Sequence, residues 1–282
     1  MCSPGPERRA VPTVPTVPTV PTVEHWAEHT EVLCLPLADR RCGDRAVVGA
    51  EIHALHALRD IVAVADTVVL TAPMWVWHNQ PADRPIEPFA GHAVPGPAVV
   101  RAWRLSVGRP DVPIEPVFHN LSTETVAEAM IELFALADRR KPPGFHRVTF
   151  ALQRFVGPDA SVHAFAAPGD RHVLLKAYLG LVENLGEPLY HDQVLLDVDD
   201  LAVREYQVVH KPTATVAADG GTRTVAVAGA VRGAPVLRVD LARRLGLLAI
   251  TAARRLAGPV TLEFVVIAGE PVLVHAQLLP PT

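Results

Sequence analysis

The sequence predicts an α+β protein with two lobes, and three observations lead to this prediction. Apolar residues recur at helical spacing over residues 47–59, and again after Ser122, which is suited to cap the second helix. The second half consists mostly of short β-branched runs, the last two of which flank residues 269–271. A Pro/Gly-rich stretch, residues 141–144, separates the two halves. Two such lobes favour a ligand cleft between them.

These patterns divide the chain into three parts. Residues 1–30 include four copies of Val-Pro-Thr, and proline at every third position blocks helix and ladder hydrogen bonds, so we expect a disordered tail. Residues 31–145 form the N-terminal lobe and residues 146–282 the C-terminal lobe. The remaining expected elements are a β-branched run at 61–70, strands at 148–156, 161–167 and 172–178, a helix capped by Asp240, and a closing hairpin.

The composition argues against several classes of protein. The net charge is −4 and no long basic run is present, so nucleic acid is not an expected partner. No apolar stretch reaches the roughly 18–20 residues that a membrane-spanning helix needs, so no membrane partner is expected either. The three cysteines, Cys2, Cys34 and Cys42, form no disulfide framework, which indicates free thiols and a cytoplasmic location.

The closing hairpin offers a candidate metal site. If its loop comprises residues 269–271, Ala268 faces Val272 and Glu263 lies directly opposite Gln277. Directly opposed residues share one face of a sheet, with Cβ atoms roughly 5 Å apart. Two oxygen ligands at this separation suit a hard cation such as Mg²⁺. The alternative is that the two residues are a surface pair on a solvated face of the hairpin.

Several stretches follow one another in an order typical of one family. They are residues 152–156, 160–165, 177–185, 191–197 and 205–213, and finally Leu262-Glu263-Phe264 with Gln277 and Pro280. In these motifs the sequence resembles the ATP-grasp nucleotide-binding domain of phosphoenolpyruvate synthase, pyruvate phosphate dikinase and rifampicin phosphotransferase. The resemblance covers about residues 45–282, and its motifs are most specific from residue 146 onward.

The resemblance implies an ATP and Mg²⁺ site between the two lobes. Glu263 and Gln277 match the positions that hold Mg²⁺ on the ATP phosphates, and Arg101 matches an arginine that contacts phosphate through its planar fork of donors. These three are the candidate catalytic residues. Other matches fall on the linker whose backbone meets the adenine and on a segment beside the nucleotide. The matching residues there are Gln153, Arg154, Phe155, Val156 and Glu183.

The sequence departs from the family pattern at charged positions. The phosphate-binding lysine of the family falls on Glu51, an acidic position falls on Thr261, and an arginine falls on Leu279. Phosphoryl transfer depends on neutralising developing charge, so these changes should slow it by orders of magnitude unless other residues substitute. The basic residues considered as substitutes are Arg104, Arg109 and Lys176.

Two functions therefore remain in view. The first is an ATP-dependent phosphotransferase that uses Mg-ATP in the interlobe cleft to phosphorylate a small molecule or an acceptor histidine. That histidine would belong to a separate phosphohistidine-domain protein, because the sequence contains no match to this domain of the family. The second is a catalytically degenerate pseudoenzyme that senses nucleotide or binds another protein, and the altered charged positions favour it.

Overall fold

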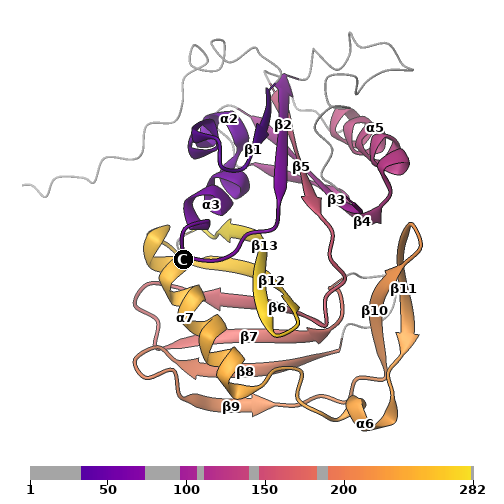
Figure 1. Ribbon diagram of the computed structural model, residues 1–282. Coiled ribbons are helices and arrows are strands. Elements are labelled where there is room, and N and C mark those ends of the chain that lie inside the picture. The colour runs from indigo at the N-terminus through magenta and orange to yellow at the C-terminus, as the bar shows by residue number, and fades with distance from the viewer. Residues whose placement is uncertain (1–32, 74–95, 107–110, 140–145, 183–189, 281–282) are drawn as a thin grey trace, which may run out of the picture.

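The computed structural model describes residues 33–73, 96–106, 111–139, 146–182 and 190–280. The expected tail at 1–30, together with Arg109 and Glu183, lies outside these residues. Two large antiparallel sheets form separate layers, with helices packed against both (Figure 1). The α+β class is therefore confirmed.

The first sheet has five strands in the order β1-β2-β5-β3-β4 and forms the upper layer in Figure 1. Helix α5 (Thr123–Arg139) covers one of its faces, and it begins directly after Ser122, as the sequence predicts. Met130 and Leu133 of this helix are fully buried against the sheet. The strands are β1 (Leu33–Pro36), β2 (Thr67–Pro73), β3 (Ala98–Ser106), β4 (Val112–Leu121) and β5 (His146–Arg154).

The second sheet has six strands in the order β13-β12-β6-β7-β8-β9 and forms the lower layer. A separate two-stranded hairpin, β10 (Thr213–Ala218) and β11 (Gly221–Ala226), stands beside both layers, and Asn120 of β4 donates a hydrogen bond of 2.9 Å to the Gly221 carbonyl of this hairpin. The six strands are β6 (Ala160–Ala166), β7 (His172–Leu179), β8 (His191–Asp197), β9 (Val203–Gln207), β12 (Val260–Ile267) and β13 (Glu270–Leu278).

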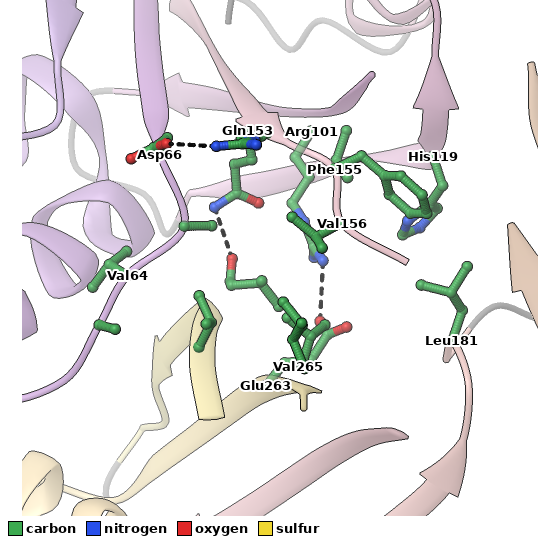
Figure 2. A pocket seen from close by; sticks show the side chains of 17 residues that line it. Val64, Asp66, Arg101, His119, Gln153, Phe155, Val156, Leu181, Glu263 and Val265 are labelled. Carbon is green, nitrogen blue, oxygen red and sulfur yellow. Dashed lines mark hydrogen bonds and ion pairs between the residues drawn. The ribbon is translucent and has the colours of Figure 1, made fainter. Parts of the chain in front are cut away.

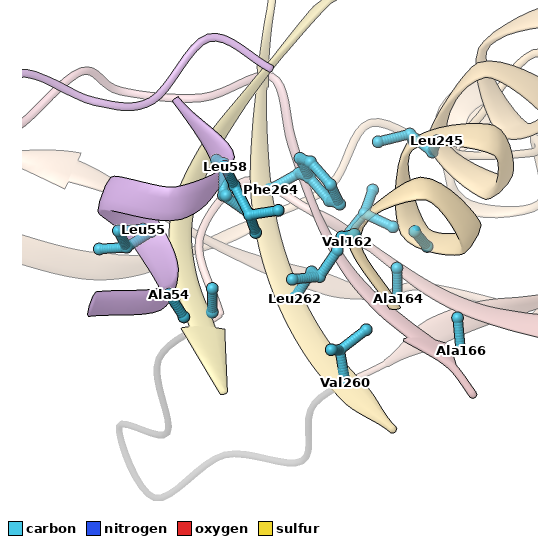
Figure 3. Packing of buried hydrophobic residues seen from close by; sticks show 14 of the residues in the cluster. Ala54, Leu55, Leu58, Val162, Ala164, Ala166, Leu245, Val260, Leu262 and Phe264 are labelled. Carbon is cyan, nitrogen blue, oxygen red and sulfur yellow. The ribbon is translucent and has the colours of Figure 1, made fainter. Parts of the chain in front are cut away.

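One face of the six-stranded sheet is covered by α3 (Ala50–Leu58) and α7 (Val239–Arg255). Figure 3 shows Leu58 of α3 and Leu245 of α7 on either side of Phe264, and all three are fully buried. Gly246 allows α7 to lie close to the sheet, because a Cβ atom there would be 2.5 Å from Leu196. This face is closed, so a ligand site on this sheet has to lie on the opposite face.

The first helical segment is interrupted. The sequence predicts one helix over residues 47–59, whereas the structure has α2 (Arg45–Val48) and α3, separated by Gly49 with a φ of 90°. Asp111 accepts a hydrogen bond of 2.6 Å from the Ala50 amide at the start of α3. The remaining short helices are η1 (Arg40–Gly43) and α6 (Gly229–Arg232).

The boundary between the lobes lies later than the sequence predicts. The predicted boundary at residue 145 would place β5 in the same lobe as β6, but β5 pairs with β2 and β3, and β6 pairs with β7 and β12. Residues 155–159 therefore connect the two sheets. The Pro/Gly-rich stretch before residue 146 follows the end of α5, and such residues terminate helices whether or not a domain also ends.

The loop of the closing hairpin is shorter than the sequence predicts. Ile267 pairs with Glu270, so the loop contains only Ala268 and Gly269. Both loop residues have positive φ, 51° and 82°, as in the two-residue turns whose twist matches that of the strands. Because of this change in the loop, each residue of β12 pairs with a residue of β13 that lies nearer the turn than the predicted partner.

A register shift then follows between Glu263 and Phe264, because β13 contains one extra residue there. The extra residue shifts the pairing by one position in the direction away from the turn, which does not restore the predicted register. Glu263 consequently lies opposite His275, and Gln277 lies opposite Thr261. The prediction that Glu263 directly faces Gln277 is therefore wrong.

The cysteines and the hydrophobicity of the helices can be compared with the expectations from composition. Cys34 and Cys42 are free thiols, as the sequence predicts. Among the described residues, no helix has both the length and the apolar character that crossing a membrane requires.

Candidate functional site

A cavity of about 200 Å³ lies between the two sheets, beside residues 155–159 (Figure 2). Its wall is mostly apolar and comes from both sheets, with Val99 from the upper sheet and Val265 and Val272 from the lower one. Concave, largely apolar sites with a few polar groups are typical of small-molecule binding. The polar residues of the wall are Asp66, Arg101, His119, Gln153, Arg154 and Glu263.

Strand alternation directs these side chains into the cavity. Side chains two residues apart share one face of a strand, so Val99 and Arg101 on β3 point the same way, as do Glu263 and Val265 on β12. The alternate residues of β12, such as Phe264, face the helices instead. The same pattern that builds the core therefore supplies one wall of the cavity.

Leu181 closes another side of the cavity. Its amide donates a hydrogen bond of 2.9 Å to the carbonyl of Thr215 on β10. Gly180 makes this contact possible, because its φ is 71° and a Cβ atom there would lie 2.1 Å from the Thr215 oxygen. The β10–β11 hairpin is thus tied to the edge of the site.

The segment between the sheets is anchored at its start. The Arg154 and Phe155 amides donate hydrogen bonds of 2.8 Å to the carbonyls of Asp66 and Pro97. Within the residues that the structure describes, the Val156 amide and carbonyl have no hydrogen-bond partner. One donor and one acceptor thus remain on the backbone of a residue that lines the cavity.

An ion pair joins the two sheets at the cavity. Arg101 of β3 donates a hydrogen bond of 3.1 Å from Nη2 to Oε2 of Glu263 on β12 (Figure 2). The two side chains are only 11% and 13% exposed. The Nε atom of Arg101 is buried and has no hydrogen-bond partner within the described part of the chain. Arg101 and Glu263 are two predicted catalytic residues that the fold brings together.

The surroundings of Glu263 are strongly basic. Burial acts to raise the pKa of its carboxyl, but the charges of Arg101, His275, His163 and His119 outweigh burial and lower it. Burial likewise acts to lower the pKa of Arg101, and its acidic neighbours, Glu263 first, raise it. Both partners are therefore ionised at neutral pH.

A second pair, between helix α3 and the lower sheet, lies beside the first. His275 of β13 is 2.5 Å from a carboxylate oxygen of Glu51 on α3, measured from Nδ1. The Glu51 carboxylate also acts on the pKa of Arg101, so the two pairs form one group of charges. Glu51 stands where the resemblance places a lysine. Its carboxylate is bonded to the imidazole of His275.

A row of polar residues crosses the lower sheet on its open face. Glu263 pairs with His163, His163 with Lys176, and Lys176 with Gln193. Of the basic residues considered as substitutes for missing cations, Lys176 therefore shares a face with Glu263. Arg104 does not, because it lies on the other face of β3 and its guanidinium donates to the Ala137 carbonyl of α5.

The predicted linker residues take different places. Phe155 and Val156 line the cavity. Arg154 is exposed, with its guanidinium 3.8 Å from the Asp66 carboxylate. The Gln153 side chain is 1% exposed. Its amide nitrogen donates hydrogen bonds of 2.9 Å to the Val274 carbonyl and 3.3 Å to the Thr67 hydroxyl. Gln153 thus ties β5 to β2 and to the closing hairpin.

The residues around Glu263 do not fit a Mg²⁺ ion. Mg²⁺ on a nucleotide is octahedral and usually takes one or two carboxylates from the protein, while the phosphates and water supply its other oxygen ligands, so a protein carboxylate has to be available to it. Among the described residues, no group of three or more His, Cys, Asp or Glu side chains is placed to hold a metal ion. Glu263 is bonded to Arg101 and lies between His163 and His275, whereas Gln277 is exposed two residue pairs further along the hairpin.

Sequence reasoning did not identify His163 or His275 as site residues. The alternation of β6 carries a signal for His163, because Val162 and Ala164 predict the buried face and His163 falls between them. His275 depends on the hairpin register, which local patterns leave open.

Comparisons with known proteins give structural neighbours only. No protein-family model matches the sequence, and no curated protein sequence is similar to it. A D-alanine–D-alanine ligase from Bacillus anthracis shows 12% identity and a TM-score of 0.39, over 86% of this chain and 58% of that one. A phosphoribosylglycinamide synthetase from Anaerococcus prevotii shows 11% identity and a TM-score of 0.35, over 85% and 43%. The chain spans about half the length of the solved structures it matches.

Proposed function

We propose that this chain is an ATP-grasp-type domain that binds ATP in the cavity between its two sheets. The observation that carries the proposal is the cavity itself, which combines apolar walls, a buried arginine, and a backbone donor and acceptor at Val156 that no described residue pairs with. An adenine ring has flat apolar faces and a polar edge. Val99 and Val265 suit the faces, and the Val156 backbone suits the edge.

The size of the cavity suits the adenine base of ATP, not the whole nucleotide. Complete sites for drug-sized ligands usually measure about 300–1,000 Å³, whereas this cavity measures about 200 Å³. The phosphates would therefore lie outside it, next to Arg101 and over the open face of the lower sheet. A contact with phosphate would also satisfy the buried Nε of Arg101, which has no partner among the described residues; leaving such a buried donor unpaired costs about 1–3 kcal/mol.

The reaction that accompanies this site is phosphoryl transfer of the phosphoenolpyruvate synthase and pyruvate phosphate dikinase type. The acceptor would be a small molecule or a histidine on a separate phosphohistidine-domain protein. Arg101 would stabilise the charge that develops on the transferred group, because a preorganised cation in a buried site needs little reorganisation.

Nucleotide binding without transfer is the second candidate. The specific observation in its favour is Glu51, which places a carboxylate beside the phosphate position and is held there by His275 at 2.5 Å. A buried anion opposes the charge neutralisation that transfer needs. Such a domain would act as a nucleotide sensor or as a module for binding another protein.

Calorimetric titration with ATP, in separate experiments with and without Mg²⁺, tests the binding site. Val272→Trp fills the cavity and should abolish binding, while Leu247→Trp, at an exposed position of α7, should leave it unchanged. No binding by the wild type in either condition would refute the proposal. Release of labelled phosphate, or its transfer to an added acceptor, above the level of Arg101→Met would then favour transfer over binding alone.

A further inference from the structure

The open face of the lower sheet places a lysine near the Arg101–Glu263 pair. Lys176 stands two strands from Glu263 in the row of cross-strand pairs, and neighbouring strands are about 4.8 Å apart. Its ammonium group lies 5.6 Å from the centre of the Phe165 ring, a cation–π contact along the same face. Lys176 is therefore directed over the sheet beside the proposed nucleotide.

Lys176 has no acidic partner in the part of the chain that the structure describes. Its cross-strand neighbours are His163 on one side and Gln193 on the other. Burial lowers the pKa of His163, so this imidazole is neutral at pH 7 and does not repel the ammonium group strongly. Lys176 is therefore half-buried, and no carboxylate of the described residues balances its charge.

A divalent cation at Glu263, in contrast, meets the positive charge of Arg101. The carboxylate already balances Arg101, and the second nearby carboxylate, Glu51, is bonded to His275. A metal ion would have to displace a guanidinium from a pair that is nearly nine-tenths buried. Displacing it would leave a buried cation without its partner, which is strongly unfavourable.

We propose that the cleft binds the phosphates of the nucleotide with its own groups, Arg101, Lys176 and a hydrogen bond from His163, and without a divalent metal ion. This inference rests on the proposed nucleotide binding and specifies how that site works. Arginine supplies a planar fork of donors and lysine a mobile point charge, and both are common phosphate ligands. The pair Arg101–Glu263 then keeps the arginine in place before the nucleotide arrives.

Metal dependence tests the proposal directly. ATP is titrated into the full-length chain by calorimetry, once with excess Mg²⁺ and once with excess EDTA. The two dissociation constants should agree within about threefold. Tighter binding in Mg²⁺ by a larger factor overturns the inference and leaves the proposed function intact. Absence of binding in both conditions removes the proposed function and this inference with it.

A pair of variants tests the role of Lys176. Lys176→Ala should weaken ATP binding by about tenfold, the effect of losing one charge-assisted contact, and should leave adenosine binding unchanged. Arg244→Ala removes an exposed cation from α7, on the opposite side of the sheet, and should change neither affinity. Wild-type ATP affinity in Lys176→Ala, or an equal loss for adenosine, excludes a phosphate contact by this lysine.

Manganese provides a readout that does not involve the nucleotide. The electron paramagnetic resonance signal of free Mn²⁺ should keep its full intensity when the protein alone is added. Loss of the signal in the wild type but not in Glu263→Gln would show a metal site at Glu263 and overturn the inference.

Discussion

Two buried ion pairs of this protein, Asp192–Lys211 and Arg101–Glu263, differ in how completely hydrogen bonds satisfy them. Lys211 is fully buried, and its ammonium group donates hydrogen bonds of 2.6 Å to the Asp192 carboxylate and 2.7 Å to the Val209 carbonyl. Asp192 also accepts from the Val209 and Val236 amides, at 2.9 and 2.8 Å. This pair therefore joins β8 to the segments that flank the β10–β11 hairpin.

The Arg101–Glu263 pair shares one hydrogen bond, borders a cavity and leaves the arginine Nε without a partner among the described residues. A buried ion pair whose hydrogen bonds are all made holds its segments in one arrangement. A partly satisfied pair still has a hydrogen-bonding group that a ligand can use. The difference indicates which charges belong to the framework and which to the site.

Removal of Asp192 should have the largest effect on stability. Asp192→Ala leaves the buried Lys211 without its counter-ion, which typically costs about 3–5 kcal/mol of unfolding free energy. Urea denaturation measures the loss. Glu205→Ala, which removes an exposed carboxylate from the neighbouring strand β9, serves as the control and should change stability by less than about 0.5 kcal/mol. Equal losses in the two variants would contradict the framework role of Asp192.

Gly180→Ala should have the next largest effect, because it disturbs the contact between the framework and the cavity wall. A Cβ atom would meet the Thr215 oxygen at 2.1 Å, and φ is 71°. Overpacking and a left-handed backbone together cost about 2–4 kcal/mol. Gly220→Ala is the matched control, since its φ is 69° with no atom within 4 Å, and it should lose only about 1–2 kcal/mol. Similar melting temperatures for both variants would show that the contact with Thr215 is loose.

Glu263→Gln should destabilise the protein less than Asp192→Ala. The amide keeps the shape of the side chain and still accepts from Arg101, so the loss is the difference between a charge-assisted and a neutral hydrogen bond, about 1–2 kcal/mol. Urea denaturation under the same conditions gives the comparison. A loss as large as that of Asp192→Ala would place Arg101–Glu263 in the framework as well.

The smallest expected effect is a change in pH dependence at His163. Its folded-state pKa lies below the usual 6.5, mainly because of burial. The unfolded chain therefore takes up this proton first, so stability is full above pH 6.5 and decreases as the pH falls below it. His163→Gln should show a shallower loss of stability on acidification, measured by thermal unfolding across this range. Parallel pH profiles for variant and wild type would falsify the burial of a neutral imidazole next to Glu263.

Much of the fold is predictable because its causes are local. The alternation of Leu262, Phe264 and Val266 predicts a strand with one buried face, and the spacing of Met130 and Leu133 predicts the buried face of α5. Phe155 and Val156 are predicted at the nucleotide site by the resemblance, and they do line a cavity. The boundary at residue 145 is wrong because a helix end and a domain end carry the same Pro/Gly signal.

The candidate site is less predictable because its residues are distant in the sequence. Arg101 and Glu263 are 162 positions apart, and no local pattern states that their strands lie in facing sheets. Gln277 is misplaced because the position and length of the loop, together with one extra residue on β13, decide its partner. Lys176 can be named as a cation from the sequence, but only the order of β12, β6 and β7 places it beside Glu263.

The sequence by itself determines which residues of each strand face the core and which face outward, because that choice depends on neighbours along the chain. Only the tertiary structure decides that Glu263 meets Arg101 and His275 and not Gln277. The physical reason is that strand register and sheet order are set by the packing of the whole sheet and by the backbone of a two-residue loop.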